Sequence, residues 1–237
     1  NAGLKVVLTG EGGDELFGGY GRYRRASRAR IFGGRTMRER GAFDGLGVLI
    51  QDSDHWREAY SRTELQTSGR SKLQSLQATD CTDWLPNDLL TKLDRCLMAN
   101  GVEGRVPMLD IKLANFAFSL PDCLKIRRQK GKWLLRKWLY NTLPSSRPFS
   151  RKRGFTVPVG HWIGKEGCRL GPLVAKQSGV KEICDTQAVE SLFKATKYGN
   201  GKKVENAAWI LLFYAVWHRS HIEGLQVDGN VFDILGA

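Results

Sequence analysis

The sequence predicts an α/β fold that is mostly helical and contributes one or two strands to a parallel sheet. Residues 6–8 form a short β-branched run that ends in a glycine-rich turn, as a buried strand of such a sheet does. Several later segments repeat apolar residues at helical spacing, as Leu89, Leu93 and Leu97 do. A length of 237 residues is enough for one large domain with a substantial core.

The turn after the first strand is the most informative segment of the chain. It combines three glycines with three acids: Gly10, Gly12, Gly13, Glu11, Asp14 and Glu15. The glycines let the backbone bend sharply and approach a ligand closely. In open α/β sheets, ligands bind at the carboxyl ends of the strands. Because carboxylates repel phosphate, a phosphate ligand would fit this turn only with Mg²⁺ between the two.

The turn matches neither of the common nucleotide-binding loops. A Walker A loop needs Lys and then Ser or Thr after its last glycine, whereas Gly19 is followed by Tyr20. The dinucleotide pattern G-x-G-x-x-G also fails, since its last position, counted from Gly10, is Glu15. A flexible strand-to-helix connection with solvated acids is the less favoured alternative for this segment.

The remaining elements are predicted to be helices. A helix starts near Asp14 and leads into an arginine-rich stretch, and residues 33–56 are expected to be irregular. Further helices are expected at residues 86–100, 110–120, 132–143 and 204–221. Within the third of these, Leu135, Trp138 and Leu139 are expected to point inward.

The turn lies within a longer motif, residues 9–20, which reads T-G-E-G-G-D-E-L-F-G-G-Y. This motif resembles the synthetase-domain signature of glutamine-dependent asparagine synthetases, and three further blocks also resemble blocks of that family. Residues 85–110 are similar to the family's central motif in spacing and order, and Lys132-x-x-Leu135-Arg136 resembles its K-x-x-L-R helix. Residues 151–158, with Trp162, resemble its R-x-K-x-G-F-x-x-P…W element. The blocks stand in the family's order.

This resemblance implies that residues 1–237 are the C-terminal synthetase domain, truncated at its N-terminus and without the glutaminase domain. The implied fold is the mostly helical part of an adenine-nucleotide α-hydrolase-like domain, whose parallel sheet has lost its upstream strands. The family's pyrophosphate loop, S-G-G-x-D-S, does not occur in the sequence. We therefore expect the chain alone to lack half of its ATP site and to be inactive.

The resemblance also implies a reaction and roles for individual residues. ATP activates the side-chain carboxylate of aspartate as β-aspartyl-AMP, and ammonia released from glutamine by the glutaminase domain then displaces AMP. Glu11 is the expected base and Lys132 the expected cation, while Asp14 would be the ligand of Mg²⁺. Thr9, Gly10, Gly12 and Arg136 are expected to bind ATP or substrate.

Four charged residues are expected to support the site rather than to react. Asp94, Arg95, Glu103 and Arg105 would form a buried charge network beside the turn. Direct contact of Glu103 and Arg105 with substrate is the alternative. Gly104 stands where the family more often has a small aliphatic residue.

Two other functions remain open. A related synthetase could adenylate another carboxylate, as β-lactam-forming and peptide-cyclising enzymes do. A basic, non-enzymatic binding module is the second, because the net charge is +13. Eleven Lys and Arg and no acid lie between Lys125 and Arg153, but no nucleic-acid-binding motif accompanies them. Nucleic acid is therefore not the expected partner.

The five cysteines indicate a cytoplasmic protein. Their number is odd and they form no C-x-x-C pair, and Cys96 and Cys123 are expected to be reduced core residues. The longest apolar run, residues 207–217, is too short to span a bilayer. No membrane partner is expected, and a homodimer is an open possibility.

Overall fold

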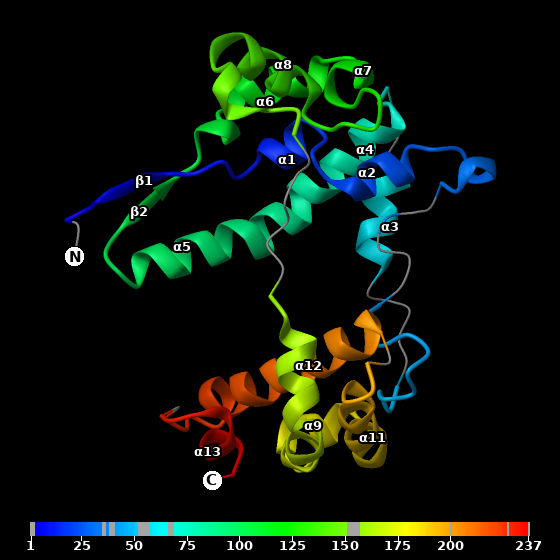
Figure 1. The fold of residues 1–237 in the computed structure, drawn as a ribbon, viewed down its shortest axis with the longest axis vertical. Coiled ribbons are helices and arrows are strands. Elements are labelled where there is room, and N and C mark those ends of the chain that lie inside the picture. Colours follow the sequence, from blue (N-terminus) through cyan, green and yellow to red (C-terminus); the bar gives the residue numbers. More distant parts are fainter. Residues whose placement is uncertain are drawn as a thin grey trace. The chain divides into compact units, whose positions relative to one another are not determined.

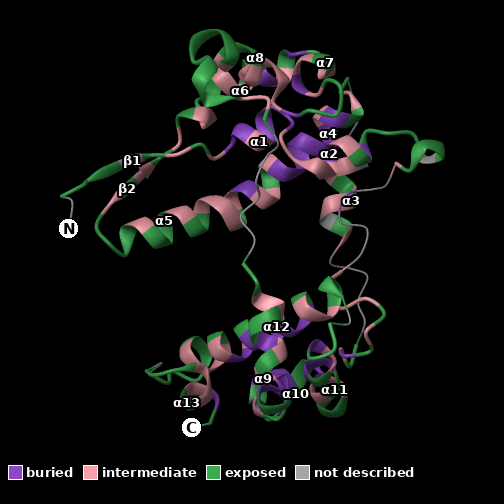
Figure 2. Ribbon diagram, in the orientation of Figure 1, coloured by how far each residue is buried: buried purple, intermediate pink, exposed green. Residues whose placement is uncertain are grey.

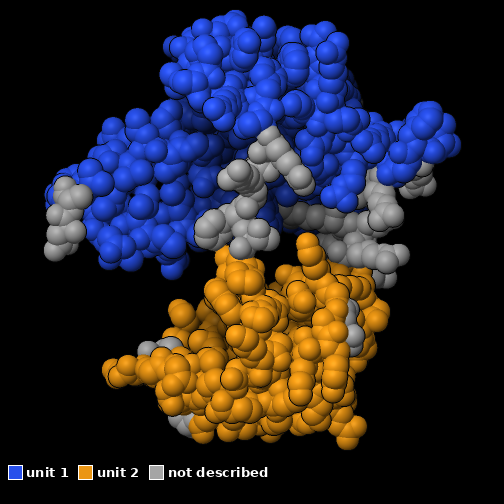
Figure 3. Space-filling view, viewed as in Figure 1, with its two compact units in different colours: residues 1–39, 55–152 blue, residues 40–54, 153–237 orange. Residues whose placement is uncertain are grey.

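The computed structural model describes residues 3–34, 37, 41–51, 57–65, 69–150, 157–199, 201–226 and 228–236. The chain forms two compact units, coloured separately in Figure 3. Unit 1 comprises residues 1–39 and 55–152, and unit 2 comprises residues 40–54 and 153–237. Figure 1 traces the elements within each unit.

Unit 1 contains the sheet and the segments that resemble the synthetase signature. Its elements are β1 (Val6–Leu8), α1 (Gly13–Leu16), α2 (Gly21–Ala26), η1 (Arg30–Phe32), α3 (Glu58–Leu65), α4 (Lys72–Thr79), η3 (Asp80–Leu90), α5 (Thr91–Met98), β2 (Glu103–Arg105), η4 (Pro107–Leu109), α6 (Ile111–Ser119), α7 (Asp122–Lys125), α8 (Trp133–Thr142) and η5 (Pro144–Ser146). The prediction of a mostly helical chain with a small parallel sheet is confirmed.

The sheet consists of β1 and β2, which pair in parallel with Val7 opposite Gly104. A Cβ on Gly104 would lie 2.7 Å from Leu97 Cδ1, so the glycine lets α5 pack closely against β2. The expectation that β1 is buried is wrong for this structure, because Val6 is 40% and Leu8 is 70% exposed (Figure 2). The apolar run still forms a strand, because its β-branched residues favour the extended backbone.

The helix predicted to begin at residue 86 begins earlier. Ser71 caps α4 through a reciprocal pair of hydrogen bonds with Gln74, and the winding continues through η3 into α5. Pro86 lies inside η3, which is π-helical. Because the wider π turn already departs from the regular hydrogen-bond ladder, a proline is tolerated there without ending the helix. The predicted end is confirmed, since Gly101 has a φ of 64°.

The next two predicted helices are confirmed within about one residue. Asp110 caps α6 by accepting hydrogen bonds from the backbone N–H groups of Lys112 and Leu113. In α8 the inward face is partly wrong, because Trp138 is 62% exposed whereas Leu135 is half-buried. Leu135 packs near a buried cluster of Leu16, Phe17, Ala117 and Leu120, which anchors the glycine-rich turn.

Unit 2 is a helical unit with its own core. Its elements are α9 (Val159–Ala175), α10 (Ser178–Ile183), α11 (Thr186–Thr196), α12 (Lys202–Trp217), η6 (His218–Ile222) and α13 (Val231–Gly236). The sequence prediction included only the last long helix, which α12 and η6 confirm. A Cβ on Gly167 of α9 would overlap the carbonyl oxygen of Phe193, so this glycine allows α9 and α11 to touch. Their contact buries Val174, Val189 and Phe193.

All five cysteines are free. Cys96 and Cys123 are exposed, so the expectation that they are core residues is wrong. Both cysteines lie on helices that pack through their other faces. A short apolar pattern in the sequence does not determine which face of a helix packs inward. Among the described residues, no helix is both long and apolar enough to cross a membrane.

Candidate active site

The site is built on the glycine-rich segment after β1, residues 9–20, which we call the acid turn. Thr9 extends the pairing beyond β1 by donating its backbone N–H to the carbonyl of Arg105 at 2.9 Å. Gly12, at the start of α1, has a φ of 86°, and a Cβ there would overlap the side chain of Leu109. This left-handed backbone allows the chain to turn from strand into helix within four residues.

Backbone contacts hold Lys132 beside the acid turn. Its N–H donates to the carbonyl of Phe17 at 3.0 Å, and a Cβ on Gly131 would overlap the carbonyl oxygen of Gly18. Lys132 itself has a φ of 55°, a left-handed conformation that is unfavourable for a side chain of this size. Such strain persists only where surrounding contacts hold it, and it is common at functional sites.

The result is an ion pair between the two residues predicted to act on phosphate. Lys132 Nζ lies 3.1 Å from Asp14 Oδ2, and both side chains are about one quarter exposed, at 28% and 23%. Gly19 makes this pair possible, since a Cβ there would overlap Asp14 Oδ1 and would lie 2.6 Å from Lys132 Cε. Gly19 had no predicted role, although the Gly18-Gly19 repeat is visible in the sequence.

A buried polar network holds the back of the acid turn. Glu15 is 1% exposed and accepts a hydrogen bond from the Tyr20 hydroxyl at 2.6 Å. The side-chain amide of Gln77 donates to the carbonyls of Glu15 and Leu16, at 2.5 and 2.8 Å. Lys125 Nζ in turn donates to Gln77 Oε1 at 3.0 Å. This network ties α4 and α7 to the acid turn.

Burial shifts the pKa values of two groups in this network. Burial raises the pKa of Tyr20 above its usual range, and the hydrogen bond to Glu15 raises it further. It lowers the pKa of Lys125, since removal from water disfavours the ammonium. Gln77 and Lys125 were not recognised in the sequence, because an isolated Gln and one Lys of a basic run carry no distinguishing pattern.

The acid turn begins with three residues that were predicted to act on ligands: Thr9, Gly10 and Glu11. Thr9 Oγ1 is buried and has no hydrogen-bond partner among the described residues. A buried hydroxyl without a partner is costly, which suits a ligand-binding role. Glu11 is half-buried and Gly10 is exposed. Their predicted roles as base and substrate contact are not tested by this geometry and remain predictions.

Arg136 has a bracing contact that the sequence did not reveal. Its Nε donates to the Gly131 carbonyl at 2.9 Å, and another guanidinium nitrogen donates to the carbonyl of Pro148. The guanidinium therefore secures the segment that carries Lys132. Its predicted contact with ATP remains a prediction.

The four residues expected to form a buried charge network are all exposed in this structure: Asp94, Arg95, Glu103 and Arg105. The expectation of burial is therefore wrong here. Glu103 and Arg105 pair with each other at 2.9 Å on β2, where water screens the interaction. Glu103 and Arg105 lie on the outer strand of a two-stranded sheet, and Asp94 and Arg95 lie on α5, a helix with no buried residue.

Asp14 is compatible with a magnesium role only if substrate supplies further ligands. The described residues contain no group of three or more His, Cys, Asp or Glu side chains placed to hold a metal. Mg²⁺ is often held by one or two carboxylates together with substrate phosphates, however. A single carboxylate beside a lysine fits that arrangement.

Of the last block, residues 151–158 with Trp162, residues 151–156 lie outside the described residues. Trp162, on α9, is 55% exposed. This tryptophan therefore contributes little to the core of unit 2.

Comparison with known proteins identifies the family. The family model for asparagine synthase matches residues 1–219. This chain belongs to the asparagine synthase family. It is 28% identical to glutamine-hydrolyzing asparagine synthetase 1 of Bacillus subtilis, in an alignment that covers 93% of the chain and 41% of the relative. A putative glutamine-hydrolyzing asparagine synthetase of Mycobacterium tuberculosis is also 28% identical, with 93% and 40% covered.

Another match to this asparagine synthase family chain comes from an archaeon. A putative glutamine-hydrolyzing asparagine synthetase 1 of Methanocaldococcus jannaschii is 34% identical over half of the chain and 15% of its own length. The chain thus spans about two fifths of the length of its first relatives. No solved structure matches it significantly.

Proposed function

We propose that this chain supplies the synthetase centre for ATP-dependent amidation of aspartate to asparagine. The observation that carries the proposal is the Lys132–Asp14 ion pair at 3.1 Å. The pair packs against Gly19 so closely that any side chain at that position would overlap it. A cation and a carboxylate fixed together at the end of a parallel strand suit a magnesium-bound polyphosphate. The family membership supports aspartate and glutamine-derived ammonia as the reactants.

In the first step, an oxygen of the aspartate side-chain carboxylate attacks the α-phosphorus of ATP. The bond between the α-phosphorus and the bridging oxygen breaks, and pyrophosphate leaves as β-aspartyl-AMP forms. Lys132 stabilises the negative charge that grows on the departing pyrophosphate. When bound, Mg²⁺ would supply further charge neutralisation, with Asp14 as its protein ligand.

In the second step, ammonia attacks the activated carbonyl carbon and the carbon–oxygen bond to AMP breaks. The attacking nitrogen must lose a proton, and Glu11 accepts it. Thr9 and Gly10 contact the nucleotide or substrate through the Thr9 hydroxyl and the backbone, and Gly12 permits the close approach of the chain. Arg136 maintains Lys132 in place through Gly131.

Several features of the whole protein belong to the same proposal. Ammonia comes from a glutaminase domain outside these residues, and the fold is the adenine-nucleotide α-hydrolase type. Five free cysteines and the biosynthetic relatives support a cytoplasmic location.

The two steps can be separated experimentally in the full-length protein. Exchange of labelled pyrophosphate into ATP reports the first step and should require aspartate. Glu11→Gln should retain this exchange but lose most asparagine formation with ammonia as the donor, since proton removal contributes about 10²–10⁴-fold.

The opposite results would contradict the assignment. Wild-type asparagine formation by Glu11→Gln would exclude Glu11 as the base. Exchange that depends on a different carboxylic acid and not on aspartate would favour a related adenylating synthetase.

A further inference from the structure

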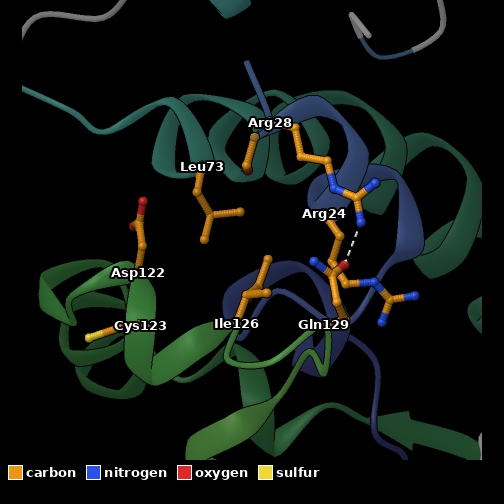
Figure 4. Close-up of a pocket in the computed structure, with 8 residues that line it drawn as sticks. Arg24, Arg28, Leu73, Asp122, Cys123, Ile126 and Gln129 are labelled. Atoms are coloured by element: carbon orange, nitrogen blue, oxygen red, sulfur yellow. Dashed lines mark hydrogen bonds between the residues drawn. The ribbon is translucent and has the colours of Figure 1, made fainter. Parts of the chain in front are cut away.

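Unit 1 contains a second candidate site, a cavity of about 340 Å³ that shares no lining residue with the acid turn. Residues from three parts of the chain line it: Arg24, Arg28, Leu73, Asp122, Ile126 and Gln129. Figure 4 shows Leu73 and Ile126 between Asp122 on one side and the two arginines on the other. Cavities of this size hold small organic molecules.

The basic side of the cavity is preorganised. Arg28 donates to Gln129 Oε1 at 2.6 Å, which restrains its guanidinium, and Arg24 lines the same side of the cavity. Among the described residues, no carboxylate forms an ion pair with Arg24 or Arg28. Two arginines that line one cavity suit a planar acid group, because a guanidinium can offer two parallel N–H donors to a carboxylate.

The acidic side is fixed as well. Ser71, the cap of α4, donates its hydroxyl to Asp122 Oδ1 at 2.9 Å. The carboxylate is thereby held at the cavity wall, across the apolar side chains of Leu73 and Ile126. A ligand that carried only negative charge would satisfy the arginines but would be repelled by Asp122.

A strained hairpin forms one side of this cavity. Arg128 and Gln129 have φ values of 47° and 62°, and Arg127 and Lys130 bridge across them. Such a two-residue turn normally contains Asn and Gly. Two bulky residues in the left-handed region cost free energy, and such strain is concentrated at ligand clamps and active sites. The Arg28–Gln129 hydrogen bond offsets part of that cost.

We propose that this cavity binds a small aminocarboxylate, with the acid group at Arg24 and Arg28 and the amino group at Asp122. Leu73 and Ile126 would cover the aliphatic part between the two charges. The proposal depends only on the cavity and stands whether or not the synthetase assignment is correct. The cavity also adjoins the acid turn, because a Cβ on Gly18 would lie 3.0 Å from Cγ1 of Ile126, one of the lining residues.

The test uses the 237-residue chain and needs neither ATP nor Mg²⁺. Glycine, γ-aminobutyrate and ε-aminohexanoate are titrated by NMR, with butyrate, butylamine and inorganic phosphate as single-charge or purely anionic probes. At least one aminocarboxylate should bind and should shift the amide signals of Arg28 and Gln129. The matching carboxylate without an amine should bind about tenfold more weakly, as expected for the loss of one charged hydrogen bond.

Three variants assign the two ends of the ligand. Arg24→Gln and Arg28→Gln should each weaken aminocarboxylate binding by about tenfold. Asp122→Asn, which keeps the oxygen that accepts from Ser71, should abolish the preference for γ-aminobutyrate over butyrate. Arg25→Gln is the matched control, because Arg25 is exposed on the same helix and does not line the cavity.

The proposal is overturned if none of the three aminocarboxylates binds, or if phosphate or butyrate binds as tightly as they do. An equal loss of affinity in Arg25→Gln would also overturn it, since the effect would then reflect general surface charge. The ligand series on the unmodified chain decides the matter even if a variant fails to fold.

Discussion

At the scale of single residues, backbone contacts determine where the side chain of Lys132 starts and hence which groups its ammonium can reach. The left-handed conformation, the bond to the Phe17 carbonyl and the close approach of Gly131 to Gly18 all fix the Cα position. The ion pair with Asp14 then orders the rest of the lysine side chain. This preorganisation is what electrostatic stabilisation of a leaving group requires.

Lys132→Ala in the full-length protein should slow aspartate-dependent pyrophosphate release by about 10²–10³-fold, the usual cost of losing one transition-state contact. Lys137→Ala is the control, because Lys137 is exposed on α8, the helix that Lys132 precedes. Rapid-quench measurement of pyrophosphate separates this step from amide formation. A change confined to the affinity for glutamine would rule out a role for Lys132 in phosphate chemistry.

Gly19→Ala should separate the ion pair while leaving the fold intact. The added methyl meets the ends of two flexible side chains, Asp14 and Lys132, which can move aside. We expect pyrophosphate release to fall by about 10²-fold, as for other small displacements of reacting groups. The stability should stay near that of the wild type.

Gly131→Ala is the informative contrast to Gly19→Ala. Its methyl meets the backbone oxygen of Gly18, which cannot move alone, so unfolding should become easier by about 1–3 kcal/mol. Urea unfolding of both variants tests the distinction. If both variants lost the same stability, a methyl group that meets flexible side chains would cost as much as one that meets the backbone, and the predicted difference would be wrong.

At the scale of elements, the long helical stretch α4–η3–α5 organises the back of the acid turn. Gln77 and Asp80 are completely buried, and Asp80 accepts two hydrogen bonds from Arg22, at 3.0 and 2.7 Å. The stretch therefore bonds to α2 and to the acid turn through side chains. A satisfied buried polar network of this kind fixes one arrangement, because any alternative leaves charges without partners.

Cys81, on the same stretch, should resist alkylation. Burial first, and then the charges of Glu15 and Asp80, raise the pKa of its thiol from about 9 to about 12. At pH 8 the thiolate fraction should be about 10³ lower than for an ordinary thiol, so labelling by iodoacetamide should be correspondingly slow. The exposed Cys96 and Cys123 label in the same sample and serve as internal controls.

The same shift makes stability fall with pH. A thiol whose pKa is higher in the folded state contributes stability that is complete below pH 9 and declines as the pH rises toward 12. Cys81→Ala should remove that decline, at most about 1.4 kcal/mol per pH unit. Rapid labelling of Cys81 at pH 8, or an unchanged alkaline slope in Cys81→Ala, would contradict the assigned burial.

The sequence predicted elements whose signals are local. Asp110 at a helix start, Gly101 after a helix end and the apolar run before a glycine turn each depend on a few neighbouring residues. The sequence could not predict the start of α4, because Pro86 is typical of a helix start. That a helix continues through this proline depends on the π turn around it. Nor could the sequence predict that Gln77 and Lys125 meet behind Glu15, because that contact joins segments far apart in sequence.

At the scale of the whole molecule, β1 leaves apolar side chains and a strand edge of unit 1 exposed. Leu4, Val6 and Leu8 alternate along one face and are 61%, 40% and 70% exposed. Within the described residues, β1 pairs only with β2, along one of its edges. An apolar strand with an open edge is a template for pairing with another chain. The relatives, which are more than twice as long, contain further chain that could cover this surface.

The 237-residue chain should consequently self-associate through β1 as its concentration rises. Leu8→Lys should suppress this association, because a charge on the strand opposes edge-to-edge pairing. Ile31→Lys is the matched control: Ile31 is 85% exposed and lies away from the sheet, and the change in charge is the same. Sedimentation velocity over a range of concentrations measures the effect. If both substitutions suppressed association equally, net charge would be the cause and the open edge of β1 would have no special role.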